Sequence, residues 1–132
     1  MKKLLLFLFI LVSVIMYSCK RGPGEGGSST IKGKVYRYKY NANFSAILDS
    51  GYTDKEDVFI IYGDDVTFGN DQKTNYDGTY EFKYLRKGKY KIFAYENDSS
   101  KYPNTGNKPV LLDVEITKNK QTVEVPDLII IK

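Results

Sequence analysis

Tyrosine is the residue type through which this chain is best equipped to bind a ligand, since the sequence contains twelve tyrosines and no tryptophan. Tyr36, Tyr38 and Tyr40 alternate with Arg37 and Lys39. Rings spaced by two residues lie on one face of a β-strand, where they can stack on a sugar or a base or contact a protein. The alternative is ordinary packing, in which half-exposed rings pair across strands and lysine protects a sheet edge.

Two long loops are predicted at residues 41–56 and 97–108 of the same domain. Because connections between consecutive antiparallel strands alternate between the two ends of a sandwich, both loops and the Asp77-Gly78 turn are expected at the end far from residue 31. Long loops on a rigid scaffold often carry binding residues. The candidate binding surface therefore comprises Tyr36, Tyr38, Tyr40, Phe44, Tyr52, Tyr102 and Asn104. Alternatively, the apolar residues of the first loop cover the open end of the core.

The sequence offers little for catalysis. It has no histidine and one cysteine, which excludes a histidine base, a thiolate zinc site and a Cys-His nucleophile. A G-x-S-x-G nucleophile motif is also absent. Pairs of carboxylates could hydrolyse a glycoside, but no two acidic residues stand out by their spacing. We therefore expect neither enzymatic activity nor a cofactor.

Acidic and amide residues are concentrated between positions 64 and 77, which raises the question of calcium. The calcium-loop template fails here, because aligning its glycine with Gly78 places Lys73 at the first ligand position. Asp and Asn are also common in turns, where they bond to their own backbone. Turn formation is the favoured interpretation, and a calcium ion remains an alternative for Asp64, Asp65, Asn70, Asp71, Asn75 and Asp77.

The N-terminus is typical of an export signal. Lys2 and Lys3 precede an apolar run that is shorter than the ~20 residues needed to span a bilayer. Cys19 follows this run directly, after the small Ser18, and this arrangement resembles the lipidated cysteine of bacterial lipoproteins. The resemblance implies a signal peptide over residues 1–18 and a lipid on Cys19. The alternatives are ordinary cleavage with release of a soluble protein, and a permanent transmembrane anchor.

Residues 19–30 are predicted to combine the lipidated cysteine with a flexible tether, because this stretch is rich in glycine and serine. Four of the 20 basic residues and one of the 16 acidic residues precede position 31, so residues 31–132 carry a net charge of +1. A nearly neutral domain lacks the clustered basic surface that nucleic-acid binding requires. We expect residues 31–132 to form one domain that binds no nucleic acid.

Hydrophobic periodicity of two predicts an all-β fold for this domain. No segment has a convincing helical pattern; the best candidate is Phe44, Ile47 and Leu48. The Asp77-Gly78 turn and a second turn at Gly88 predict a meander of successive hairpins. About seven strands in an antiparallel β-sandwich are expected. They cover residues 31–40, 58–62, 80–84, 90–94, 110–116 and 122–131, with one short strand near 66–68 or 74–76.

The motif T-x-x-x-G-x-Y-x-F-x-x-L-x-x-G-x-Y, which runs from Thr74 to Tyr90, resembles the carboxypeptidase-regulatory-like, transthyretin-like β-sandwich. The segment Ile31-Lys32-Gly33-Lys34-Val35 supports the same resemblance, which implies a transthyretin-like or Ig-like sandwich and no particular chemistry. Gly78 and Gly88 are expected to supply positive φ at turns. The fold-defining residues are then Gly33, Val35, Asp77, Gly78, Tyr80, Phe82, Gly88 and Tyr90.

Together these features predict a non-catalytic lipoprotein of the bacterial cell envelope, with the outer membrane favoured over the inner. It would serve as an accessory or interaction subunit and contact another envelope protein through the tyrosine-rich strand or an exposed sheet edge. The alternative is a carbohydrate-binding module that presents tyrosines near the distal loops. The absence of tryptophan is an argument against the alternative, because sugar platforms favour the larger ring.

Overall fold

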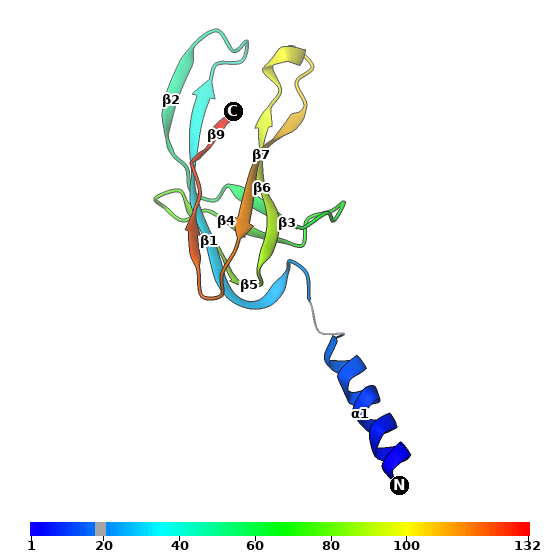
Figure 1. Cartoon of the computed structure of the whole chain (residues 1–132). Coiled ribbons are helices and arrows are strands. Elements are labelled where there is room, and N and C mark those ends of the chain that lie inside the picture. Colours follow the sequence, from blue (N-terminus) through cyan, green and yellow to red (C-terminus); the bar gives the residue numbers. More distant parts are fainter. Residues whose placement is uncertain (18–20) are drawn as a thin grey trace.

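The computed structural model describes residues 1–17 and 21–132, with only the backbone described for residues 11–17. The described part is mostly β, with two sheets that form a β-sandwich and one N-terminal helix (Figure 1). Its elements are α1 (Lys2–Tyr17), β1 (Glu25–Tyr40), β2 (Ile47–Tyr52), β3 (Asp57–Tyr62), β4 (Asn70–Lys73), β5 (Thr79–Leu85), β6 (Gly88–Asn97), the 3₁₀ turn η1 (Ser99–Lys101), β7 (Asn107–Ile116), β8 (Thr122–Glu124) and β9 (Leu128–Ile131).

The long strand β1 organises the first sheet. Its first half pairs with β5 on one side and β8 on the other, and its second half pairs with β2 and β9. β8 and β9 run parallel to β1, whereas β2 and β5 are antiparallel to it. The break between β8 and β9 contains Pro126, which has no N–H to donate to a ladder.

The second sheet is antiparallel throughout, in the order β4-β3-β6-β7. The β6–β7 hairpin is its longest pairing and runs from Gly88 opposite Ile116 to Asn97 opposite Asn107. β3 lies between β4 and β6, which confirms the prediction of a central strand at residues 58–62.

The hydrophobic core lies between the two sheets. Val35, Tyr80, Phe82 and Tyr90 are all buried, as the sequence predicts. Burial of each such side chain contributes about 1.5–3 kcal/mol to folding. Their principal partners in the core are Ile31, Val58, Ile60, Leu85, Ile92, Ala94, Val114, Ile116, Leu128 and Ile130.

Glycines at three predicted positions shape this core. Gly78 and Gly88 adopt φ of 80° and 144°, which confirms the expected turns. Gly33 has a different role, because a Cβ at this position would lie 2.5 Å from the Tyr80 hydroxyl oxygen and 2.7 Å from Val125. The ring of Tyr80 therefore occupies space that only glycine leaves open.

Several sequence predictions of secondary structure are wrong in detail. The described residues contain nine strands rather than about seven, and the sandwich is not entirely antiparallel. Ile47 and Leu48 of the best helical candidate lie in β2, which pairs with β1 as the second strand of a hairpin, and Phe44 lies in the loop before it. The short strand expected within 65–76 is β4, which lies between the two predicted places.

The predicted meander is also wrong. β5 pairs with β1 in the first sheet, whereas β6 pairs with β3 and β7 in the second, so the chain crosses between sheets at residues 86–87. The hydroxyl of Tyr90 stabilises this crossing, because it donates to the Arg86 carbonyl at 2.6 Å and accepts from the Gly24 amide at 2.9 Å. Alternation alone does not specify a partner strand.

The structure differs from the predicted tether at residues 25–30, which form the start of β1. Ser29 is fully buried, and its hydroxyl donates to the Lys118 carbonyl at 2.8 Å and accepts from the Gln121 amide at 3.1 Å. Cys19 and Ser18 lie outside the described residues. Within the described ranges, no helix has both the length and the hydropathy of a membrane-spanning segment.

Candidate functional site

Three of the predicted binding residues form a cluster on the outer surface of the first sheet. Val35 points into the core, so Tyr36 and Tyr38 project outward from β1, and Tyr52 of β2 lies opposite Tyr36. The ring centroids of Tyr36 and Tyr52 are 5.2 Å apart, and those of Tyr36 and Tyr38 are 5.3 Å apart. Both pairs meet edge to face, a favoured aromatic geometry. We call Tyr36, Tyr38 and Tyr52 the tyrosine face.

Polar contacts hold the rings of the tyrosine face in place. The Tyr52 hydroxyl donates to Oδ2 of Asp127 at 2.8 Å, and the Tyr36 hydroxyl contacts Oγ of Ser50 at 3.3 Å. Nζ of Lys34 lies 4.8 Å from the centroid of the Tyr52 ring. The hydrogen bond to Asp127 and the charge of that carboxylate raise the pKa of Tyr52 above its ordinary value of 10.0. Tyr52 is thus a neutral donor at physiological pH.

A hollow of about 270 Å³ adjoins the tyrosine face. Lys34 and Asp127 contact Tyr52 and also line this hollow, and Lys32 and Glu124 add a second cation and a second carboxylate. Donors and acceptors thus lie beside aromatic rings, which suits a ligand with both hydroxyl groups and C–H faces. We call this space the lysine-carboxylate hollow.

The hydroxyl of Tyr80 lies near Gly33 and Val125, two residues that also line the lysine-carboxylate hollow. This hydroxyl is buried and has no hydrogen-bond partner among the described residues. Burial, with a smaller contribution from the charge of Asp127, raises the pKa of Tyr80 far above its ordinary value. Tyr80 is therefore neutral at every physiological pH.

The other predicted residues gather at the tips of two hairpins. Phe44, between β1 and β2, lies 6.1 Å from Tyr40 and 6.4 Å from Tyr102 between ring centroids. The prediction that the two long loops meet at one end is confirmed, and Figure 1 shows both hairpin tips at the same end of the sandwich. Asn104 is exposed on the same loop as Tyr102.

One expectation about this end of the molecule is wrong, and the alternative in which loop residues cover the core does not fit Ile47 and Leu48. The Asp77-Gly78 turn lies against the middle of β1 instead, because the Val35 amide donates to the Gly78 carbonyl at 2.9 Å. Ile47 and Leu48 do not cover the core, since 53% and 63% of their surfaces are exposed. β2 is the last strand of the first sheet, and its pairing with β1 is irregular at these two residues, since Tyr40 pairs with Ile47 and Lys39 with Asp49.

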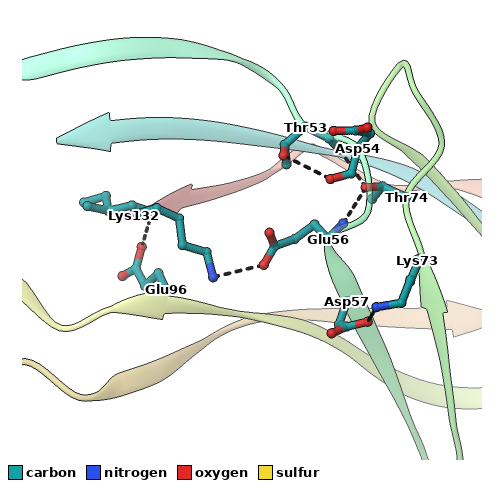
Figure 2. Close-up of polar contacts among 9 residues, drawn as sticks. Thr53, Asp54, Glu56, Asp57, Lys73, Thr74, Glu96 and Lys132 are labelled. Atoms are coloured by element: carbon teal, nitrogen blue, oxygen red, sulfur yellow. Dashed lines mark hydrogen bonds and ion pairs between the residues drawn. The ribbon is translucent and has the colours of Figure 1, made fainter.

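Charged side chains connect the two sheets near the end of β9 (Figure 2). Nζ of Lys132 lies 3.0 Å from Oε1 of Glu56, and Oε2 of Glu96 accepts the Ile131 amide at 3.1 Å. Lys108 of β7 adds a contact with Glu96 at 3.4 Å. These contacts connect the end of β9 to the opposite sheet. They thereby fix the position of β1 and of the tyrosines it carries.

The sequence analysis missed an aromatic cluster on the outer surface of the second sheet. Phe59 of β3 stacks on Phe93 of β6, with centroids 4.9 Å apart and ring planes at 16°. The ring centroids of Phe68 and Tyr95 lie 4.8 Å and 5.6 Å from that of Phe59. We call Phe59, Phe68, Phe93 and Tyr95 the phenylalanine face. The sequence feature that could have indicated this cluster is the pair Phe93 and Tyr95. These two residues alternate with the buried Ile92, Ala94 and Glu96 along β6.

The calcium alternative for positions 64 to 77 concerns how the acidic side chains are placed. Within the residues that the structure describes, no three Asp, Glu or Cys side chains come close enough to hold a metal ion. Asp77 instead accepts a hydrogen bond from the Thr79 amide at 3.1 Å, and this bond is among the contacts with Thr79 that lower the pKa of Asp77. This is the turn chemistry that the sequence favours.

Comparison with known proteins assigns no family. No family model matches the chain, and no curated protein matches it. Among solved structures, the chain is similar to the crystal structure of a putative carbohydrate-binding protein (PA1324) from Pseudomonas aeruginosa. The two share 14% sequence identity, with a TM-score of 0.50 over 86% of this chain and 93% of the other. At this identity the similarity establishes the class of fold, a β-sandwich, and no more.

Proposed function

We propose that this protein is a non-catalytic carbohydrate-binding module that binds glycan through the tyrosine face. The observation that carries the proposal is the position of Tyr52, a residue that is 48% exposed while its hydroxyl is held by Asp127. A ring held in this way loses little conformational entropy when a ligand binds. The fold similarity to a protein described as carbohydrate-binding supports the same class of ligand.

The residues around Tyr52 fit the two surfaces of a sugar ring. The C–H face of a sugar is apolar and can pack on an aromatic ring, whereas its hydroxyl groups need hydrogen-bond partners. Lys34 and Asp127 of the lysine-carboxylate hollow supply a donor and an acceptor next to Tyr52. Lys32 and Glu124 extend this set on the far side of the hollow.

The proposal is tested by retention on polysaccharides. The full-length chain in detergent is mixed with insoluble cellulose, chitin, xylan or peptidoglycan, and the bound fraction is measured after centrifugation. Retention on at least one polymer is expected, and Tyr52→Ala should weaken it about tenfold, which corresponds to about 1.4 kcal/mol. Tyr76→Ala is the matched control, because Tyr76 is 91% exposed and lies outside the tyrosine face. Equal retention of the two variants would contradict the assignment.

We further propose that Cys19 carries a lipid that anchors the chain to the bacterial envelope, with the outer membrane favoured. The support comes from the sequence, in which Cys19 follows the apolar segment directly. Metabolic labelling with an alkyne fatty acid should modify the wild-type protein and leave Cys19→Ser unlabelled. Labelling of the Cys19→Ser variant, or recovery of the wild-type protein in the soluble fraction, would contradict the anchor.

An accessory role beside another envelope protein is the second candidate function. It is favoured by the phenylalanine face, where Phe68 remains 48% exposed. In-cell crosslinking and purification from solubilised membranes would then recover a partner in near-stoichiometric amount. Crosslinks that map to the second sheet would support this role, and a protein recovered alone would contradict it.

A further inference from the structure

A groove of about 460 Å³ lies between the two sheets where β4 approaches β5. β4 is the last strand of the second sheet, and β5 pairs only with β1 in the first. Figure 1 shows the two strands near each other in the lower half of the sandwich. The groove thus follows the junction between two sheet edges, and it was not predicted from the sequence.

The polar lining of the groove favours an uncharged ligand. Lys73 is paired with Asp57 at 2.6 Å, and Lys83 with Glu81 at 3.5 Å. A basic lining with unpaired cations would attract phosphate or nucleic acid, but these lysines already have carboxylate partners. Glu25 also lines the groove, and its Oε1 accepts from Tyr62 and Asn70. The lining thus carries two lysines and two carboxylates, and this balance of charge does not select an ionic ligand.

Side-chain amides provide hydrogen-bonding capacity in the same groove. Asn70 donates to Oε1 of Glu25 at 3.3 Å, which also accepts from the Tyr62 hydroxyl at 3.2 Å. The side chains of Gln72 and Asn75 also line the groove, and each carries both a donor and an acceptor. An amide can bond to a hydroxyl group in either direction, which suits a sugar.

Tyr84 supplies an aromatic surface at the rim of the groove. It is 71% exposed, and its φ of 60° is unusual for a bulky residue. The pairing of β1 with β5 is irregular at this point, because both Glu25 and Ser29 lie opposite Leu85. Strained backbone of this kind is retained where surrounding structure enforces it, often at binding sites.

The groove adjoins the lysine-carboxylate hollow of the proposed glycan site. Lys32 lines the lysine-carboxylate hollow, Glu81 lines the groove, and their side chains meet at 3.6 Å. The linings of the two spaces therefore meet at this ion pair on the first sheet. A ligand chain several units long can contact both spaces, whereas a short one can contact only one.

We infer that the groove between β4 and β5 is a second glycan subsite, in which Tyr84, Gln72 and Asn75 bind further units of a neutral polysaccharide chain. This inference rests on the proposed function and deepens it, because it assigns the ligand to extended, uncharged polymers rather than to single sugars. The tyrosine face and the groove then act as two parts of one binding track.

The test measures how binding depends on ligand length, using the full-length chain in detergent. Protein retained on cellulose, xylan or chitin is released by soluble oligosaccharides of the same polymer with about two or about six sugar units. The longer ligand should compete at least about tenfold better, which corresponds to about 1.4 kcal/mol. Tyr84→Ala and Gln72→Ala should remove most of this difference without changing competition by the shorter ligand. Tyr76→Ala, which replaces an exposed tyrosine outside the groove, should behave as wild type.

The outcomes separate the subsite from the function. Equal competition by both oligosaccharide lengths, or unchanged competition in Tyr84→Ala, would overturn the assignment of the groove as a subsite. The proposed function would still stand if Tyr52→Ala reduced retention on the polymer. Failure of the wild-type protein to bind any polymer would overturn both. Release by unfolded, carboxymethylated casein but not by oligosaccharides would show that the strand edges pair with extended polypeptide, and would overturn the ligand class.

Discussion

The two outer surfaces of this sandwich both carry aromatic clusters, but their rings have different partners. On the tyrosine face, Tyr52 bonds to a carboxylate and adjoins a hollow lined by charged groups. On the phenylalanine face, Phe59 and Phe93 stack on each other, and only 7% of the Phe93 surface is exposed. The first cluster bonds to polar groups, whereas the second packs Phe68 and Tyr95, both still exposed, around a stacked pair of phenylalanines.

The comparison shows that aromatic residues on an outer strand face do not by themselves indicate a binding site. Phe59 and Phe93 form a small additional core on the second sheet, and Phe68 and Tyr95 contact this pair while 48% and 39% of their surfaces stay exposed. The tyrosine face combines the exposed Tyr52 and two half-buried rings with fixed donors and acceptors, which is the combination that ligand sites require. The following predictions test this difference.

The largest expected effect is that of Phe93→Ala on stability. Loss of a nearly buried ring should lower the free energy of unfolding by about 3 kcal/mol. Urea unfolding at equilibrium measures this change, and polysaccharide retention should persist where the variant is folded. Leu111→Ala is the control, because Leu111 of β7 lies opposite Phe93 of β6 but is half exposed. Equal losses in the two variants would contradict a packing role specific to Phe93.

Phe68→Ala should have a smaller effect on the same face. The ring is half exposed but lies 4.8 Å from Phe59, so its removal should cost about 1 kcal/mol. Val66→Ala in the same loop is the matched control, because Val66 is almost fully exposed and should not change the unfolding midpoint. A Phe68→Ala variant as stable as the Val66→Ala control would show that Phe68 is free for a partner rather than packed.

Tyr52→Phe separates the ring from its hydroxyl on the tyrosine face. The substitution keeps the stacking surface and removes the bond to Asp127, so glycan retention should fall about threefold, less than in Tyr52→Ala. The polysaccharide sedimentation assay measures both variants side by side. Retention that is as low in Tyr52→Phe as in Tyr52→Ala would assign binding to the hydroxyl rather than to the ring.

The smallest expected effect is a change in the ionisation of Tyr52, which ultraviolet absorbance measures. Asp127 raises the pKa of Tyr52, so the hydrogen bond stabilises the fold below the ordinary tyrosine pKa of 10.0 and this contribution disappears as pH rises through the folded value. Ultraviolet titration should therefore show one late-ionising tyrosine fewer in Tyr52→Phe. In Asp127→Asn the same group should ionise earlier than in the wild-type protein. Identical titrations of the wild-type protein and the Asp127→Asn variant would contradict the bond.

The sequence predicted the sandwich and much of its core correctly. Val35, Tyr80, Phe82 and Tyr90 were assigned to the core from alternation and from the glycine turns, which are local properties. The proximity of Phe44 and Tyr102 followed from counting strand directions. The crossing from β5 to β6 was missed, because a short turn between two alternating segments looks the same whether they pair with each other or join two sheets.

The candidate site was only partly accessible from sequence. Tyr36, Tyr38 and Tyr52 were named in advance, but Asp127 is 75 positions from its partner Tyr52 and nothing in the chain connects them. The groove between β4 and β5 depends on two strand edges in different sheets, so no local pattern could indicate it.

The sequence by itself determined which side chains of each strand face inward, because successive residues of a strand point to opposite faces. It thereby determined the all-β class, the core and the outward tyrosines of β1. Only the tertiary structure decided which strands are neighbours, which polar groups meet the tyrosines and where the sheet edges leave a groove. The physical reason is that backbone hydrogen bonds between strands are the same for every sequence, so partner choice depends on packing across the whole domain.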